Sequence, residues 1–171
     1  VELRLLWPFY LDAIISPILF FAPVFFVVYF RDLGFTVTQI SLLIVASPIF
    51  SLLSEIPTGA FADIYGRKAS VILSCFLAMI GFALLSFFTG FYAILAIFAF
   101  LGLAQTFSSG AEEAWVVDLV RNKSKKLFQN YNAKKQILDS LALILSGFIG
   151  ASLVKMFGLL VIWPIAALSF L

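Results

Sequence analysis

Residues 59–68 interrupt an otherwise apolar chain with ordered glycines and opposite charges: Gly-Ala-Phe-Ala-Asp-Ile-Tyr-Gly-Arg-Lys. Twenty-two uncharged residues, 33–54, lie before this decapeptide, and forty-three, 69–111, follow it. Charged side chains are costly inside a membrane and are retained there for function. We therefore predict a tight loop at one membrane face, with Gly66 in a turn conformation and the basic pair after it at the head groups.

Asp63 and Arg67 have the strongest polar chemistry in this decapeptide. At a helix end, Asp63 can accept hydrogen bonds from the amides of a neighbouring helix N-terminus. The Arg67 guanidinium can bind a carboxylate through two parallel hydrogen bonds. The alternative is that these charges only fix helix ends and topology.

Further acidic residues lie within or beside apolar runs, at Asp12, Glu55, Glu112 and Glu113. An unpaired charge in a membrane costs at least about 2.5 to 3.5 kcal/mol, so each carboxylate should face a water-filled cavity, meet a cation or hold a proton. Polar residues at helical spacing extend two of these positions into stripes, formed by Asp12 and Ser16 in one run and by Gln105, Ser108, Ser109, Glu112 and Glu113 in another.

Ion pairs are the alternative explanation for these carboxylates. Glu112 or Glu113 can pair with Lys134 or Lys135, and Asp139 with Lys135. Glu55 can pair with Arg67 or with a basic residue of the segment 121–126.

The composition assigns the chain to the membrane proteins. Hydrophobic residues make up 63% of it and charged residues 12%, with a mean hydropathy of +1.13. The alternating pattern of a membrane barrel is missing, so we predict an all-α polytopic bundle. The chain has no histidine, its one cysteine, Cys75, lies in an apolar run, and no glycine-rich phosphate loop follows a strand. We therefore expect no enzyme activity, no cofactor and no metal site.

Six membrane-spanning segments are predicted. The uncharged run 69–111 would be about 65 Å long as one helix, about twice a bilayer core, so it must turn back at Thr89-Gly90. Thr36 or Thr38 is expected to cap the second span. The sixth apolar run has thirteen residues, about 20 Å of the roughly 30 Å required, so we expect it to be truncated. The predicted spans are 5–30, 36–62, 69–88, 91–120, 128–154 and 159–171.

Prolines and small residues predict bends and close contacts in these spans. Bends are expected at Pro8, Pro17, Pro23, Pro48 and Pro57. Ladders of small residues predict close helix approach on the fourth and fifth spans, at Gly102, Thr106, Gly110 and Ala114 and at Ser146, Gly147, Gly150 and Ala151.

Lysine and arginine set the expected orientation. Nine of these residues lie on the side of the N-terminus and two, Arg31 and Lys155, on the other. This bias predicts a multi-pass protein of the cell membrane with a cytoplasmic N-terminus. The basic segment 121–126 is interpreted as a topology signal, with contact to anionic lipid as the alternative. No basic patch interleaved with aromatic residues indicates nucleic-acid binding.

With six spans and this decapeptide between the second and third, the chain resembles the N-terminal half of the major facilitator superfamily. The family signature is matched by Gly59, Ala62, Asp63, Gly66, Arg67 and Lys68. One position departs from it, because Ile64 stands where a basic residue is common. The segments 55–58 and 109–114 also look like this superfamily.

The resemblance implies roles for the predicted residues. In the family this loop latches the N-terminal half to the C-terminal half in the outward-facing state. An acidic residue at the end of the fourth span completes the charge group, and Asp118 matches it. Spans one and four line the central cavity in the family. This chain lacks the arginine of span four and the glycine-proline motif of span five that superfamily antiporters often carry, so proton antiport is not established.

The resemblance implies secondary active transport of a small solute by alternating access, with proton coupling left open. The partners would be the solute, the lipid bilayer and a missing C-terminal six-helix half. The alternative is a six-span fragment or packing partner that lacks this half and carries no solute.

Overall fold

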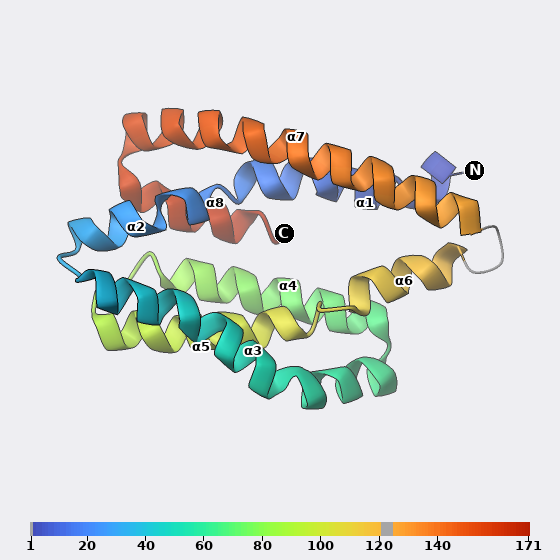
Figure 1. Cartoon of the computed structure of the whole chain (residues 1–171), viewed down its shortest axis with the longest axis horizontal. Helices are drawn as coiled ribbons and strands as arrows, with labels where there is room; N and C mark the ends of the chain where they lie inside the picture. The colour runs from blue at the N-terminus through green and yellow to red at the C-terminus, as the bar shows by residue number, and fades with distance from the viewer. Residues whose placement is uncertain (1, 121–124) are drawn as a thin grey trace.

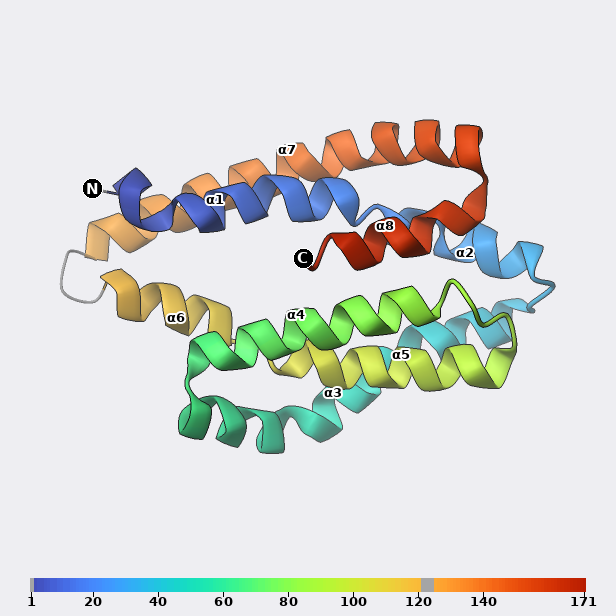
Figure 2. The ribbon, with the colours of Figure 1, turned by 180° about the vertical axis from the view of Figure 1, so that it is seen from behind.

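The computed structural model describes residues 2–120 and 125–171, and within these ranges all regular elements are helical. The predicted basic segment falls partly outside the described residues. The helices lie along one long axis in two layers, as Figures 1 and 2 show. In chain order they are α1 (Glu2–Leu19), α2 (Ala22–Asp32), α3 (Val37–Tyr65), α4 (Arg67–Leu84), α5 (Phe91–Thr106), α6 (Ala111–Val120), α7 (Lys125–Phe157), the 3-10 helix η1 (Leu159–Val161) and α8 (Ile162–Leu168).

Five segments of the described chain are long and apolar enough to cross a membrane: Leu6–Asp32, Val37–Tyr65, Arg67–Leu84, Phe91–Leu119 and Gln129–Phe157. A shorter apolar helix, Leu159–Leu168, follows them and ends about midway along the bundle (Figure 1). Large apolar side chains such as Leu52 on α3 and Phe148 on α7 are exposed, as expected for surfaces that face lipid. The fold is an all-α membrane bundle, as the sequence predicts.

Two of the candidate spans, Leu6–Asp32 and Phe91–Leu119, are each interrupted between two helices. In the first, α1 ends at Leu19 and α2 begins at Ala22. Pro23 has no N–H to donate to the Leu19 carbonyl, so the hydrogen-bond ladder stops there. In the fourth, four turn residues, 107–110, separate α5 from α6, and Gly110 has a φ of +70°. An α-helix cannot continue through a residue in this conformation, and Gly110 stands directly before the first residue of α6.

Hydroxyl groups satisfy backbone carbonyls at the second interruption. The Ser70 hydroxyl donates to the Phe107 carbonyl oxygen at 2.5 Å, and the Thr106 hydroxyl donates to the Leu103 carbonyl oxygen at 2.7 Å. The Ser108 hydroxyl bonds the Gln105 carbonyl oxygen at 2.9 Å. Irregular backbone at membrane depth is tolerated when its polar groups find such partners.

The two interrupted spans occupy equivalent places. The first span, through α1, packs along α7, and the fourth, through α5, packs along α3. Spans one to three and spans four to six form two groups within this chain. Each interrupted span therefore contacts the middle span of the other group. The third and sixth spans complete this arrangement, because α4 packs against α8 (Figures 1 and 2).

The predicted small-residue ladders are only partly packing surfaces. A Cβ added at Gly102 would lie 2.1 Å from the Ser47 backbone oxygen, so the backbones of α5 and α3 touch there. One added at Gly150 would lie 2.6 Å from the Phe21 ring. Gly110 and Gly147 have no atom within 4 Å of an added Cβ, so these two are not contact positions. Gly110 instead provides the turn conformation described above.

Short connections follow the predicted turn chemistry. Thr36 caps α3 in a capping box with Gln39, which settles the choice between the two threonines. Gly90 precedes α5 at the predicted turn, although α4 already ends at Leu84 rather than near residue 88.

Candidate functional site

The decapeptide of the sequence analysis forms a sharp turn between α3 and α4. Gly66 is the one residue between the two helices, and its φ of +91° and ψ of 148° lie outside the range that side chains with a Cβ favour. Its amide donates to the Ala62 carbonyl oxygen at 3.0 Å, and its own carbonyl accepts from the Ser70 amide at 3.2 Å. The turn places Arg67 at the first position of α4.

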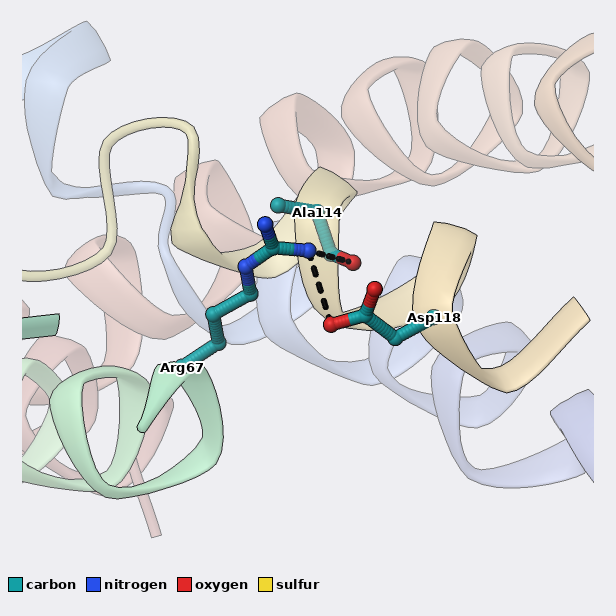
Figure 3. A network of polar contacts seen from close by, with 3 residues as sticks. All are labelled: Arg67, Ala114 and Asp118. Atoms are coloured by element: carbon teal, nitrogen blue, oxygen red, sulfur yellow. Dashed lines mark hydrogen bonds and ion pairs between the residues drawn. The ribbon is translucent and has the colours of Figure 1, made fainter. Parts of the chain in front are cut away.

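Arg67 connects this turn to α6 (Figure 3). Its Nη1 donates to the Ala114 carbonyl oxygen at 2.8 Å and to Asp118 Oδ2 at 2.7 Å. One nitrogen serves both acceptors, so the contact differs from the two parallel hydrogen bonds that a guanidinium can form with a carboxylate. The side chains of Arg67 and Asp118 are 41% and 49% exposed, which limits the energy of the ion pair to about 1 kcal/mol or less.

The other predicted latch residues of the decapeptide lie at the surface. Gly59, Asp63 and Lys68 are exposed. Within the described residues, the Asp63 carboxylate has no hydrogen-bond or ion-pair partner. Its capacity to accept hydrogen bonds is therefore available to a group from elsewhere.

Among the described residues, two hollows between the helices bear on this site. The larger, about 960 Å³, is here called the wide groove, and residues of α1, α4 and α6 and the end of the chain line it, including Asp12, Lys68 and Glu112. The smaller, about 400 Å³, is called the inner cavity, and its lining includes Gln105, Ser47 and several phenylalanines. Three residues line both hollows and form the wall between them: Ser74, Ser108 and Phe170.

The acidic residues predicted to face a cavity are separated by the structure. Asp12 lines the wide groove and accepts a hydrogen bond of 2.5 Å from the Ser16 hydroxyl. Glu112 lines the same groove but is paired with Lys135 of α7, which is one of the alternatives that the sequence left open. Glu55 and Glu113 are exposed and line neither hollow.

Two ion pairs that the sequence suggested, Lys135 with Asp139 and Arg67 with Glu55, do not form in the described residues. Lys135 donates to Glu112, and no ion pair forms between Lys135 and Asp139. Arg67, which was one possible partner of Glu55, binds Asp118.

Sequence reasoning found Gln105 but missed Ser47 and Ser74, which share the inner cavity with it. The search followed charges, and these two serines stand singly in apolar runs. The spacing of Ser70 and Ser74, one helical turn apart on α4, was the available signal, because it places both hydroxyls on one face. Ser70 meets the interruption of the fourth span, and Ser74 lies one turn along toward the cavity.

The turn formed by residues 59–68 is here called the signature turn. Comparison with known families agrees with this turn and with the helical bundle. A family model described as Major Facilitator Superfamily matches residues 10–171. The chain belongs to the major facilitator superfamily. Comparison with curated proteins and with solved structures gave no match.

Membership in the superfamily gives the general function. Its members are transporters rather than enzymes, they bind small solutes within the membrane, and secondary transport is typical of them. The chain is therefore a transporter-type protein with several membrane-spanning helices.

Proposed function

We propose that this chain forms one wall of the solute pathway of a secondary transporter that works by alternating access with a second six-helix half. The observation that carries this proposal is the contact of Arg67 with Asp118 and the Ala114 carbonyl. This contact joins the signature turn to the end of the fourth span. The two then move as one unit at one face of the membrane.

Asp63 is the residue of this unit that meets the second half. It is exposed near the end of α3, three residues before the turn at Gly66, and has no partner in the described chain. A carboxylate in such a position binds the amides of a helix N-terminus, where the helix dipole favours negative charge. That bond closes the two halves together on this face in one state and opens in the other.

The face that carries the signature turn is proposed to be cytoplasmic. Figure 1 shows the N-terminus at the same end of the bundle as the turn between α3 and α4 and the end of α6. Nine of the eleven lysine and arginine residues belong to this end in the sequence. Such an excess is typical of the cytoplasmic side, here of the cell membrane.

If transport is coupled to protons, Asp12 is the residue proposed to carry the proton. It lines the wide groove and is bonded to the neutral Ser16 hydroxyl, whereas Glu112 in the same groove is balanced by Lys135. Asp12 forms no ion pair within the described residues, which distinguishes it from Glu112.

The bond between Asp63 and the second half is tested in a fusion of this chain with the C-terminal half of a superfamily member, called the joined protein. The variant is Asp63→Asn. The amide loses the negative charge that the helix dipole favours, so the resting state should shift toward inward-facing. Labelling of single cysteines from each side of the membrane reports the shift. Asp32→Asn, at the opposite end of the bundle, is the matched control and should leave the labelling unchanged.

The same joined protein tests transport itself. Proteoliposomes that contain it should take up solute from a labelled panel in a saturable manner, and those with this chain alone should not. Uptake by the chain alone would show that it needs no second half. Unchanged labelling and uptake in Asp63→Asn would instead reduce the signature turn to a topology signal.

A further inference from the structure

The inner cavity has the size and lining of a small-molecule site. Its volume is about 400 Å³, within the range of about 300 to 1,000 Å³ that ligand sites occupy. Aromatic rings form much of its wall, from Phe20, Phe26, Phe82, Phe98 and Phe170. None of its lining residues is Asp, Glu, Lys or Arg. Such a lining favours an apolar body without charge.

Three polar side chains on the wall of this cavity have no hydrogen-bond partner within the described residues. Ser74 is only 5% exposed, yet its hydroxyl makes no hydrogen bond there. The hydroxyls of Ser41, Ser140 and Ser152, by contrast, each donate to a carbonyl of their own helix. The Ser74 hydroxyl oxygen keeps accessible surface on the cavity wall, so its hydrogen-bonding capacity is available to a molecule that enters the cavity.

Ser47 and Gln105 add two further unpaired groups on the cavity wall. Neither the Ser47 hydroxyl nor the Gln105 side-chain amide forms a hydrogen bond in the described chain. They come from α3 and α5, while Ser74 comes from α4. Groups from three helices therefore converge on one apolar space, which is the usual composition of a ligand site.

The two interruptions of the bundle meet at the same cavity. Phe20 lies in the break between α1 and α2, and Ser108 lies in the break between α5 and α6. These breaks fall in the first and fourth spans, which occupy equivalent places in the fold. Interrupted helices at corresponding positions of two repeats mark binding sites in transporters, because they expose backbone polar groups inside the membrane.

We infer that the inner cavity binds an uncharged small molecule with an aromatic or aliphatic body and one hydroxyl, carbonyl or amide group. The Gln105 amide and the two serine hydroxyls both donate and accept, so they suit any of these groups. An ion would find no counter-charge on the lining. The inference rests on the proposed function, because it names the solute class of the same transporter.

The carboxylates of the neighbouring wide groove do not change the preference of the inner cavity for an uncharged molecule. Asp12 and Glu112 line the wide groove, beyond the wall formed by Ser74, Ser108 and Phe170, and Glu112 is already paired with Lys135. A cationic solute would therefore favour the wide groove, which makes charge the variable that separates the two hollows.

Three probes with one bicyclic body test the inference: 1-naphthamide, which is neutral, 1-naphthylmethylammonium and 1-naphthoate. Tritiated forms are measured by equilibrium dialysis against the purified full chain in detergent. The neutral probe should bind at least tenfold more tightly than either ion. Equal or tighter binding of an ion, or no binding of the neutral probe, would overturn the inference.

Variants then locate the bound probe. Gln105→Leu keeps the side-chain size but removes the amide, and should weaken binding of 1-naphthamide about tenfold. Gln136→Leu, on α7, which contributes no residue to the cavity, is the matched control and should bind as the parent does. Ala78→Phe fills the cavity from α4 and should abolish binding.

Circular dichroism shows that each variant retains its helices, so a loss of binding reports the cavity. Normal binding by both Gln105→Leu and Ala78→Phe would place the probe elsewhere and overturn the inference. Dialysis does not depend on transport. Uptake by the joined protein without binding of 1-naphthamide would therefore reject this site alone, and binding without uptake would reject the proposed function alone.

Discussion

The first and fourth spans are interrupted at equivalent places but by different means. In the first, Pro23 removes one backbone donor, and phenylalanines 20 and 21 occupy the gap. In the fourth, Gly110 turns the chain with a positive φ, and hydroxyls, including that of Ser70, satisfy the free carbonyls. The first break is thus surrounded by rings and the second by hydrogen bonds.

The same contrast holds where each span meets its neighbour. The backbones of α5 and α3 touch at Gly102 and Ser47, whereas the atoms nearest a Cβ added at Gly150 of α7 belong to the Phe21 side chain. A ring can rotate or shift, but two helix backbones can only move apart. The fourth span is therefore held by contacts that permit little adjustment, and the first by side chains that can repack.

Gly102→Ala should produce the largest effect. An added Cβ would lie 2.1 Å from the Ser47 oxygen, so α5 must leave α3, at a cost of about 3 kcal/mol in the free energy of unfolding. Gly150→Ala should cost about 1 kcal/mol, because Phe21 can move. Denaturant unfolding followed by circular dichroism in detergent measures both. Equal losses would show that the two helix pairs are equally adjustable.

Ser70→Ala is expected to cost about 2 kcal/mol. It leaves the Phe107 carbonyl without the hydroxyl that bonds it at 2.5 Å, and Ser70 is fully buried. Ser140→Ala on α7 is the control, since its exposed hydroxyl bonds only its own helix. The two variants are compared in the same unfolding assay, and a similar loss for both would argue that the fourth span does not depend on this bond.

Gly110→Ala should cost about 1 kcal/mol, less than Gly102→Ala or Ser70→Ala. The added Cβ meets no atom within 4 Å, so only the strain of a positive φ remains. Pro23→Ala restores a donor at the first break and should change stability less. The same unfolding experiment measures both variants. A larger loss of unfolding free energy for Pro23→Ala than for Gly110→Ala would contradict the view that the break in the fourth span depends more on its glycine than the first break depends on its proline.

Much of the signature turn could be predicted because its causes are local. Gly66 adopts the expected turn, and the charges beside it lie at the helix ends. The sequence also anticipated bends from the prolines, although it did not indicate that Pro23 would separate two helices. The break at Gly110 was missed, because the same glycine also fitted a ladder of small packing residues. Spacing alone does not distinguish these two uses of glycine.

The sequence by itself determined the membrane class, the helical bundle and the signature turn, since these depend on composition, the length of apolar runs and the conformational freedom of single residues. Only the tertiary structure decided that Lys135 binds Glu112, that Arg67 binds Asp118, and that Ser47, Ser74 and Gln105 face one cavity. Each of these contacts joins residues of different helices. They depend on how each helix is rotated and packed against its neighbours, which no local pattern in the chain specifies.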